Sequence, residues 1–320
     1  MILTGTGLTA GGLPPSLFVG DDEVRPVFAS PRRIGFRVPR DAHGGRVAVR
    51  VGGVDGHATL VVARTLTTGL HQVDNPVFDR EGRLYVTYSG SRGQQVPVSI
   101  FRVHPSGARE SFSSAIVNPT SMVFGPDDAL YVSSRFEGVV YRVAPDGGAD
   151  PFVGDVGVAC GLAFDRDGVL YVGDRSGTIF RVRPGKHPEV LTTLPPSIAA
   201  YHLAAGADGA LFVSGPTLTT YDHVYRVAPD GHHEVFASGF GRPQGLVLEG
   251  DQLLVADALA GSSAVHRLGP GQARARVVAG EGLIGLAFDP HGGLVVSSND
   301  TVYRFDDLPG VSPLRGPEGQ

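Results

Sequence analysis

Short apolar runs alternate with polar turns along most of the chain, and one apolar tripeptide recurs at nearly constant spacing. Its six copies are Leu84–Val86, Leu130–Val132, Leu170–Val172, Leu211–Val213, Leu253–Val255 and Leu294–Val296. Successive copies start 40 to 46 residues apart. A short apolar strand and a turn rich in Gly and Asp precede each copy, and further strands follow it. Four short strands per repeat are typical of one blade of a β-propeller. The pattern therefore predicts an all-β fold containing a six-bladed β-propeller.

The last repeat ends without a fourth strand, and a candidate for that strand lies ahead of the first repeat. Residues 64–69 align with Glu234–Gly239, the fourth strand of another repeat. We therefore expect strand 64–70 to close the ring, because closure removes the unpaired sheet edges of an open array. The propeller is predicted over residues 64–307. Residues 308–320, rich in Pro and Gly, are predicted to be a loose tail.

Residues 1–63 do not follow the repeat. They contain alternating strands bounded by Gly and Pro, for example at Leu17–Val19 and Val47–Val51. This pattern predicts a separate small β-sandwich.

The composition fits this reading and excludes several classes of protein. The chain has 46 Gly, 24 Pro and a formal net charge of −5, with basic and acidic residues mixed along it. We therefore expect no nucleic-acid partner and no membrane span. The single cysteine, Cys160, excludes an intramolecular disulfide. The first residues lack the features of a signal peptide, so we expect a cytoplasmic protein, or a secreted one whose leader is absent from this sequence.

Aligning the innermost strands of the six repeats defines a ring of equivalent positions at the mouth of the predicted channel. These ring positions are Asp74, Thr120, Cys160, Tyr201, Gln244 and Ile284. The next residue is Asn75 in the first repeat and His202 in the fourth. Asp74 and His202 are the candidate catalytic residues, because a carboxylate and an imidazole can move protons near neutral pH. Asn75, Thr120, Cys160, Tyr201 and Gln244 are candidate ligand-binding residues.

Loops between the second and third strands of the repeats are expected to surround the same mouth. They contribute Arg135, Arg175 and Asp257 as further ligand-binding candidates. A guanidinium group can grip a carboxylate through two hydrogen bonds. The predicted ligand is therefore a small polar or anionic molecule.

The repeats over 64–306, with their Leu-Tyr-Val signature, resemble the gluconolactonase/senescence-marker-protein family and equally the NHL-repeat propellers. The lactonase resemblance implies hydrolysis of lactones or esters and a divalent metal, often calcium, held at the ring positions. Of the corresponding residues here, Asp74, Thr120, Cys160 and Tyr201, only Asp74 is a carboxylate. Calcium prefers several oxygen ligands, so we expect a degraded metal site with Asp74 as its one weak candidate ligand.

The order Gly5-Thr6-Gly7-Leu8, Leu17–Gly20, Ile34–Pro39 and Gly45–Val51 resembles the IPT/TIG domain, a small immunoglobulin-like sandwich. That family normally has another strand before the Gly-Thr-Gly, so we expect the domain to be trimmed at its start. The resemblance implies a spacer, or a module that binds a protein partner.

Several readings of this chemistry remain open at the level of sequence. Asp74, Cys160 and His202 together offer zinc ligands or a nucleophilic Cys-His-Asp arrangement. One observation counts against both. Cys160 is at the ring position of its strand and His202 is one residue further on in its own strand, and successive side chains of a strand point to opposite faces. The function favoured is a ligand-binding propeller of gluconolactonase-like ancestry. The alternatives are a lactone or ester hydrolase and a protein-interaction scaffold.

Overall fold

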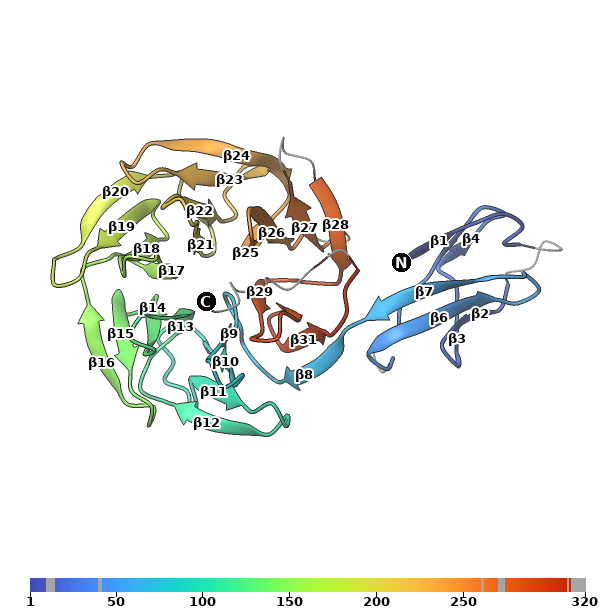
Figure 1. Cartoon of the computed structure of the whole chain (residues 1–320), viewed down its shortest axis with the longest axis horizontal. Coiled ribbons are helices and arrows are strands. Elements are labelled where there is room, and N and C mark those ends of the chain that lie inside the picture. The colour runs from blue at the N-terminus through green and yellow to red at the C-terminus, as the bar shows by residue number, and fades with distance from the viewer. Residues whose placement is uncertain (10–14, 40–41, 260–261, 270–273, 310, 312–320) are drawn as a thin grey trace, which may run out of the picture. The chain divides into compact units, whose positions relative to one another are not determined.

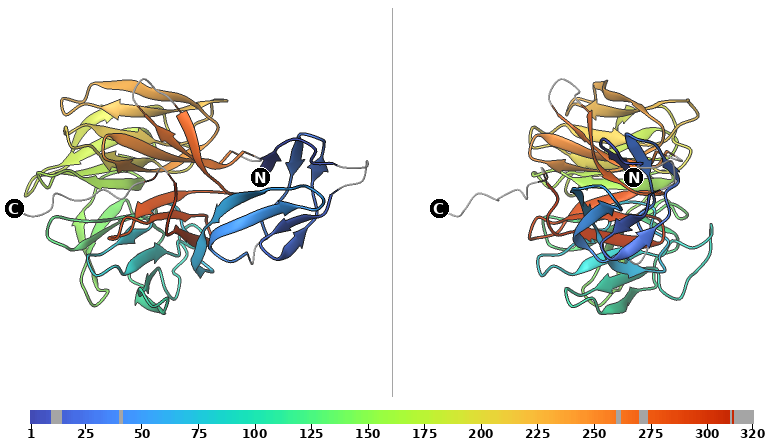
Figure 2. Two further views of the ribbon diagram at one scale, coloured as in Figure 1. Left: turned by 45° about the vertical axis from the view of Figure 1, so that its right-hand side comes forward. Right: turned by 90° about the vertical axis from the view of Figure 1, so that its right-hand side faces the viewer.

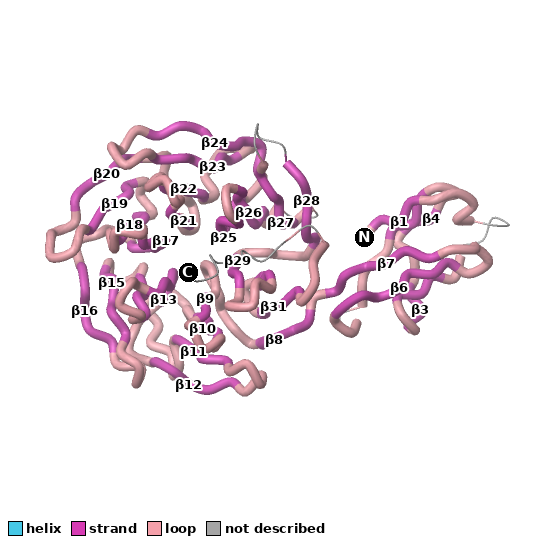
Figure 3. Tube along the Cα trace, in the orientation of Figure 1, coloured by secondary structure: helices cyan, strands magenta, loops and turns pink. Residues whose placement is uncertain are grey.

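The computed structural model describes residues 1–9, 15–39, 42–259, 262–269, 274–309 and 311. These residues form strands, turns and loops (Figure 3), and no helix among them is long and apolar enough to cross a membrane. Most of the tail predicted over 308–320 lies outside the described residues. The chain divides into two compact units, one comprising Met1–Thr65 and Tyr303–Val311 and the other built on Leu66–Val302.

The larger unit is a ring of four-stranded antiparallel sheets, each with its first strand nearest the axis (Figure 1). The first sheet comprises β9 (Val77–Phe78), β10 (Leu84–Thr87), β11 (Ile100–Val103) and β12 (Arg109–Ser113). The second comprises β13 (Pro119–Phe124), β14 (Leu130–Ser134), β15 (Val139–Val143) and β16 (Ala149–Val153). The third comprises β17 (Ala159–Phe164), β18 (Leu170–Asp174), β19 (Thr178–Val182) and β20 (Glu189–Thr193).

Three more four-stranded sheets follow along the chain. The fourth comprises β21 (His202–Ala205), β22 (Leu211–Ser214), β23 (Asp222–Val227) and β24 (His233–Phe240). The fifth comprises β25 (Pro243–Glu249), β26 (Gln252–Asp257), β27 (Ala264–Leu268) and β28 (Arg274–Ala279). The sixth comprises β29 (Gly285–Phe288), β30 (Leu294–Ser297), β31 (Thr301–Phe305) and, as its outermost strand, β8 (Arg64–Thr68).

The innermost strands follow one another around the axis in chain order. Each contacts the innermost strand of the next sheet, and β29 contacts β9. Antiparallel four-stranded sheets set around an axis in this way are the arrangement of a β-propeller. The prediction of an all-β fold is confirmed.

The tripeptide repeat fills the space between neighbouring sheets. Leu130 and Val132 of β14 are buried and pack in one cluster with Tyr85 and Ile100 of the sheet before. Because β-strand side chains alternate between faces, the middle residue, Tyr131, joins the next cluster, with Leu170 and other residues of the following sheet. Each sheet is therefore apolar on both faces, and burial between sheets stabilises the ring.

An aspartate holds the turn before the tripeptide in the first three sheets. In the third sheet, Asp165 Oδ1 accepts hydrogen bonds from the backbone nitrogens of Asp167 and Val169, at 3.0 and 2.9 Å. Its Oδ2 accepts one from the hydroxyl of Tyr171 at 3.1 Å. The recurring Asp and Tyr thus link the turn to the start of the second strand.

The smaller unit has its own core. Its strands, blue in Figure 2, form a three-stranded sheet in the order β1-β5-β4 and a four-stranded sheet in the order β3-β2-β6-β7. Their bounds are β1 (Ile2–Thr4), β2 (Leu17–Val19), β3 (Asp22–Val24), β4 (Phe28–Ala29), β5 (Arg33–Gly35), β6 (Gly45–Val51) and β7 (His57–Val62). Ile34 of one sheet packs with Leu17 and Val49 of the other in one buried cluster.

Candidate functional site

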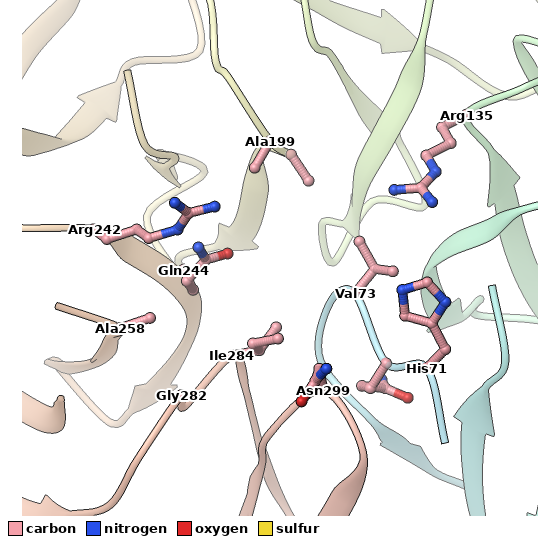
Figure 4. Close-up of a pocket in the computed structure, with 12 residues that line it drawn as sticks. His71, Val73, Arg135, Ala199, Arg242, Gln244, Ala258, Gly282, Ile284 and Asn299 are labelled. Carbon is pink, nitrogen blue, oxygen red and sulfur yellow. The ribbon is translucent and has the colours of Figure 1, made fainter. Parts of the chain in front are cut away.

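A pocket of about 470 Å³ lies at the axis of the ring. This size is within the range of small-molecule sites. Its walls are segments that lead into the innermost strands and loops that join second to third strands. The lining residues are His71, Gln72, Val73, Arg135, Ala199, Ala200, Arg242, Gln244, Ala258, Gly282, Ile284 and Asn299. Figure 4 shows Arg135 and His71 on one side and Arg242 and Gln244 on the other.

Arg135 has no counter-charge among the residues that the structure describes. Its guanidinium forms no hydrogen bond or ion pair within the part of the chain that the structure describes. Burial, together with the nearby Arg175 and Arg92, lowers the pKa of Arg135 from its usual value. An arginine nevertheless stays protonated at neutral pH. The pocket wall therefore carries a partly desolvated positive charge that a bound anion would stabilise.

His71 and Arg242 set the rest of the pocket's charge. Burial and the nearby Arg135 lower the pKa of His71 below its ordinary value of 6.5, so the imidazole is neutral at pH 7. Arg242 is exposed at the pocket. Its hydrogen bonds to described residues come from its backbone, whose nitrogen donates to Asp257 Oδ1 at 2.7 Å and whose carbonyl oxygen accepts from the nitrogen of Ala258 at 2.9 Å. No carboxylate is among the lining residues that the structure describes. Within those residues the pocket presents two positive charges and no negative one.

A buried row of three polar side chains, Asp74, His202 and Gln244, lies beside the pocket. His202 of the fourth sheet is fully buried, and its Nδ1 is hydrogen-bonded to Oδ1 of Asp74 from the first sheet. The other ring nitrogen, Nε2, lies 3.1 Å from Oε1 of Gln244 in the fifth sheet. Gln244 also lines the pocket. The predicted catalytic residues Asp74 and His202 are therefore in contact with each other, and one amide separates them from the pocket.

Two further hydrogen bonds hold Asp74 and Gln244, the two outer residues of this row, in place. Asp74 Oδ1 also accepts a hydrogen bond of 2.7 Å from the nitrogen of Asn75. Ser214, which pairs with His202 across β21 and β22, donates its hydroxyl to the carbonyl oxygen of Gln244 at 2.5 Å. A carboxylate that accepts from Nδ1 orients the imidazole and favours the tautomer with a proton on that nitrogen.

Two buried acidic residues of the surrounding loops, Asp257 and Asp174, are held by backbone nitrogens. Asp257 accepts hydrogen bonds from the nitrogens of Gly241 and Arg242 and pairs with Arg274 at 3.2 Å. Asp174 accepts from the nitrogen of Val158 at 2.8 Å. Both carboxylates are buried. Asp257, predicted to bind ligand, instead holds a loop in place and does not line the pocket.

Arg175, also predicted at the mouth, points elsewhere. Its guanidinium donates to the carbonyl oxygens of Ser197 and Ile198, at 3.3 and 3.0 Å. These bonds tie it to the segment that leads into the fourth sheet. Arg175 is therefore absent from the pocket lining and contributes only at longer range, through its effect on Arg135.

Cys160 and Tyr201 do not reach the pocket lining either. Cys160 is fully buried, and burial raises the pKa of its thiol to about 12, so the thiol is protonated at neutral pH. Tyr201 packs in the apolar core of the fourth sheet, with its hydroxyl donating to the carbonyl oxygen of Pro195. Neither is hydrogen-bonded to His202. A thiolate nucleophile paired with His202 therefore has no support in this arrangement.

Asn75 and Thr120, both predicted to bind ligand, are occupied within the ring. The Asn75 amide donates to the carbonyl oxygen of Leu246 at 3.0 Å and accepts from the nitrogen of Leu286 at 2.8 Å. The Asn75 side chain fits here because residue 245 is a glycine. A Cβ at Gly245 would lie 2.2 Å from the Asn75 amide oxygen. Thr120 donates to the carbonyl oxygen of Asn118 at 3.2 Å. The Asn75 side chain thus joins the first, fifth and sixth sheets.

The donor set does not suit a calcium ion. A hard cation requires several oxygens, preferably charged ones, whereas the pocket lining offers two guanidinium groups and amide oxygens. No group of three or more His, Cys, Asp or Glu side chains in the described ranges is arranged to hold a metal. Asp74, the weak metal candidate, faces His202 instead. The zinc set of Asp74, Cys160 and His202 is likewise not assembled.

Arg242 and His71 were not among the predicted site residues, although the sequence carries a signal for Arg242. It lies two residues before the ring position Gln244. Gln72, Ala199 and Gly282 lie two residues before their own ring positions, and all of them line the pocket. An alignment of the repeats extended by two residues would therefore have included Arg242. His71 has no equivalent signal.

Comparison with known proteins bears on the fold. No model of a protein family matches the sequence, and no curated protein matches it. A gluconolactonase from Xanthomonas campestris is 16% identical with a TM-score of 0.64, covering 77% of this chain and 90% of its own. A catalytically inactive virginiamycin B lyase from Staphylococcus aureus, solved with quinupristin, is 14% identical with a TM-score of 0.54, covering 95% and 97%. A protein of unknown function from Bacteroides thetaiotaomicron is 14% identical with a TM-score of 0.61, covering 95% and 93%.

These similarities define the class of fold, a β-propeller like those of gluconolactonase and virginiamycin B lyase. The predicted resemblance to gluconolactonase-like propellers is confirmed at the level of the fold. At such identities the fold does not carry the function with it.

Proposed function

We propose that the protein binds a small anionic molecule at the axial pocket, with Arg135 and Arg242 as its charged contacts. The observation that carries the proposal is the charge of the pocket lining, whose described residues include two arginines and no carboxylate. Arg135 is partly buried without a counter-ion among the described residues. Charge-assisted hydrogen bonds from such a group are stronger than neutral ones, and a carboxylate suits its planar fork.

The binding test uses carboxylates of increasing complexity: acetate, lactate and gluconate, with glucono-δ-lactone as the uncharged relative of gluconate. We expect Arg135→Gln to weaken carboxylate binding about ten- to a hundredfold in calorimetric titrations, the loss typical of a hydrogen bond to a charged group. The matched control is Arg166→Gln, which changes an exposed arginine in the turn between β17 and β18. Equal affinities in all three proteins would refute the proposal.

A second candidate function is the hydrolysis of a lactone or ester. The hydrogen bond between Asp74 and His202 favours it, because a carboxylate-oriented imidazole is a general base that can activate water. His202 Nε2 faces Gln244, so the amide would have to turn aside before water could reach the imidazole. The similarity in fold to a gluconolactonase agrees with this chemistry.

The hydrolysis test measures the rate of lactone opening from the amount of base needed to hold the pH constant. We expect His202→Gln and Asp74→Asn to abolish hydrolysis above the spontaneous rate and Arg135→Gln chiefly to raise KM. A wild-type rate equal to the spontaneous rate for acyl, aryl and sugar lactones would leave binding as the function.

The same reasoning extends to the architecture. We propose a six-bladed propeller closed by β8, preceded by an IPT/TIG-like sandwich that offers a surface to a protein partner. The order β29-β30-β31-β8 supports closure. The two sheets of the smaller unit around a shared core support the sandwich.

A further inference from the structure

Large exposed apolar side chains of the ring are concentrated on the loops around the pocket. In the described residues of the larger unit, ten such side chains are exposed. Three belong to the outermost strands, namely Phe152, Val190 and Val235. The other seven lie in connections of the pocket side: Tyr88, Phe136, Val158, Ile198, Leu218, Tyr221 and Leu259.

The topology places these seven on one face. In an antiparallel sheet the connections between second and third strands, and those from a fourth strand to the next sheet, emerge on the same side. All seven lie in such connections, while the described residues of the turns on the other face carry none. Scattered exposed apolar residues are ordinary, whereas their concentration on one face marks an interaction surface.

Four of the seven adjoin the pocket lining directly, and we call them the apolar rim: Tyr88, Phe136, Ile198 and Leu259. Phe136 follows Arg135, Ile198 precedes Ala199, and Leu259 follows Ala258. The Tyr88 ring meets the edge of His71, with 6.2 Å between ring centroids. Phe136 is 51% exposed, Leu259 41%, Ile198 39% and Tyr88 37%.

The rim is anchored rather than loose. Phe136 packs over Gly93 of the preceding sheet, where an added Cβ would come within 3.0 Å of the ring. Leu259 lies against Gly241, next to Arg242. The nitrogen of Ile198 donates to the carbonyl oxygen of Pro216 at 2.8 Å. A ligand seated on the rim would therefore meet surfaces already held in position, which limits the entropy lost on binding.

From this geometry we infer that the ligand is an amphiphilic anion: a carboxylate or related oxyanion carrying a medium-length acyl or aromatic body. The inference rests on the proposed anion site. The head group contacts Arg135 and Arg242 inside the pocket, and the apolar body extends outward onto the apolar rim, over either Phe136 and Tyr88 or Ile198 and Leu259, which lie in loops of different sheets. A polyhydroxylated acid such as gluconate would leave this rim in water and gain nothing from it.

The experiment measures the affinities of butanoate, hexanoate and octanoate, as monomers below their aggregation limits, with gluconate for comparison. We expect affinity to rise about three- to fourfold for each methylene group that leaves water, since burial of one contributes a fixed increment. The double variant Phe136→Ser/Leu259→Ser, which alters the rim on both sides of the pocket, should weaken octanoate binding about tenfold and leave butanoate unchanged. The matched control is Leu218→Ser, on the same face, 92% exposed and outside the pocket lining.

The outcomes separate the two levels of the argument. If gluconate and octanoate both depend on Arg135 and bind equally tightly, the anion site stands and the amphiphile is wrong. If octanoate binds Arg135→Gln as tightly as the unmodified protein, the rim acts without an anionic head and the inference also fails. If no carboxylate binds, the proposed function fails with it. Binding of anionic lipid vesicles without binding of monomeric octanoate would reassign the face to a membrane surface.

Discussion

His202→Leu tests whether the chain Asp74–His202–Gln244 is a coupled unit of the ring. The imidazole is fully buried, with Nδ1 hydrogen-bonded to Asp74 and Nε2 3.1 Å from Oε1 of Gln244, and Asp74 is only 3% exposed. Removing the imidazole leaves the buried carboxylate with the nitrogen of Asn75 as its remaining described donor. Breaking a buried pair of this kind costs roughly 3–5 kcal/mol. At about 2–4 °C per kcal/mol for a unit of this size, the melting temperature should fall by about 6–20 °C.

A double-mutant cycle isolates the interaction. Asp74→Asn should destabilise the unmodified protein by about 1–3 kcal/mol, and it should cost much less once His202 is Leu, because the partner is already gone. The chain has no tryptophan, so unfolding in urea is followed by circular dichroism or tyrosine fluorescence. The control is His232→Leu, which changes an exposed histidine in the turn between β23 and β24. Additive effects, or a His202→Leu protein within 1 kcal/mol of the original, would refute the coupling.

Three further predictions concern metal, pH and ring closure. Excess EDTA should shift the melting temperature by less than about 1 °C, because we expect no tightly bound metal ion. A filled tight metal site would add several kcal/mol to the free energy of unfolding, so a large fall in melting temperature would contradict the prediction. Burial, with help from Arg274, lowers the pKa of His266 to about 4, so the folded state binds fewer protons than the unfolded state between pH 6.5 and 4. The contribution of His266 to the free energy of unfolding is therefore complete above pH 6.5 and is lost as the pH falls through this window. His266→Phe should flatten the plot of the free energy of unfolding against pH, and an unchanged slope would exclude His266 as its source. Deleting residues 1–70 removes β8 and should lower the melting temperature far more than deleting 1–60; equal melting curves would contradict closure by this strand.

The fold could be predicted from sequence because its signal is periodic. Leu130, Val132 and their equivalents must be buried between sheets in every repeat, so the same short pattern recurs at each one. The aspartates of the preceding turns add a second periodic signal, with a local physical cause in their bonds to backbone nitrogens. Redundancy of this kind survives small errors in alignment.

The site could be predicted only in part, because it depends on where individual side chains point. Tyr201 and Gln244 occupy equivalent positions in the aligned sequence, yet Tyr201 enters the core and Gln244 the pocket. The innermost strand of the fifth sheet has an irregular register between Pro243 and Leu246, whereas β21 pairs regularly from His202 onward. The same irregularity occurs in β13 and β17, yet their ring residues Thr120 and Cys160 do not line the pocket, so register alone does not decide which side chain faces it. The residue types do not announce the difference either.

Charge at the pocket has a similar origin in local structure. The sequence places Arg175 and Asp257 at the mouth beside Arg135, a mixture with no clear preference for one sign of ligand. In the folded ring, backbone nitrogens and Arg274 neutralise Asp257, and carbonyl oxygens hold Arg175. Among the described residues, Arg135 and Arg242 are the charged side chains that line the pocket. The loops thus hold Asp257 away from the lining, because a buried carboxylate must find donors and the amides of Gly241 and Arg242 supply them.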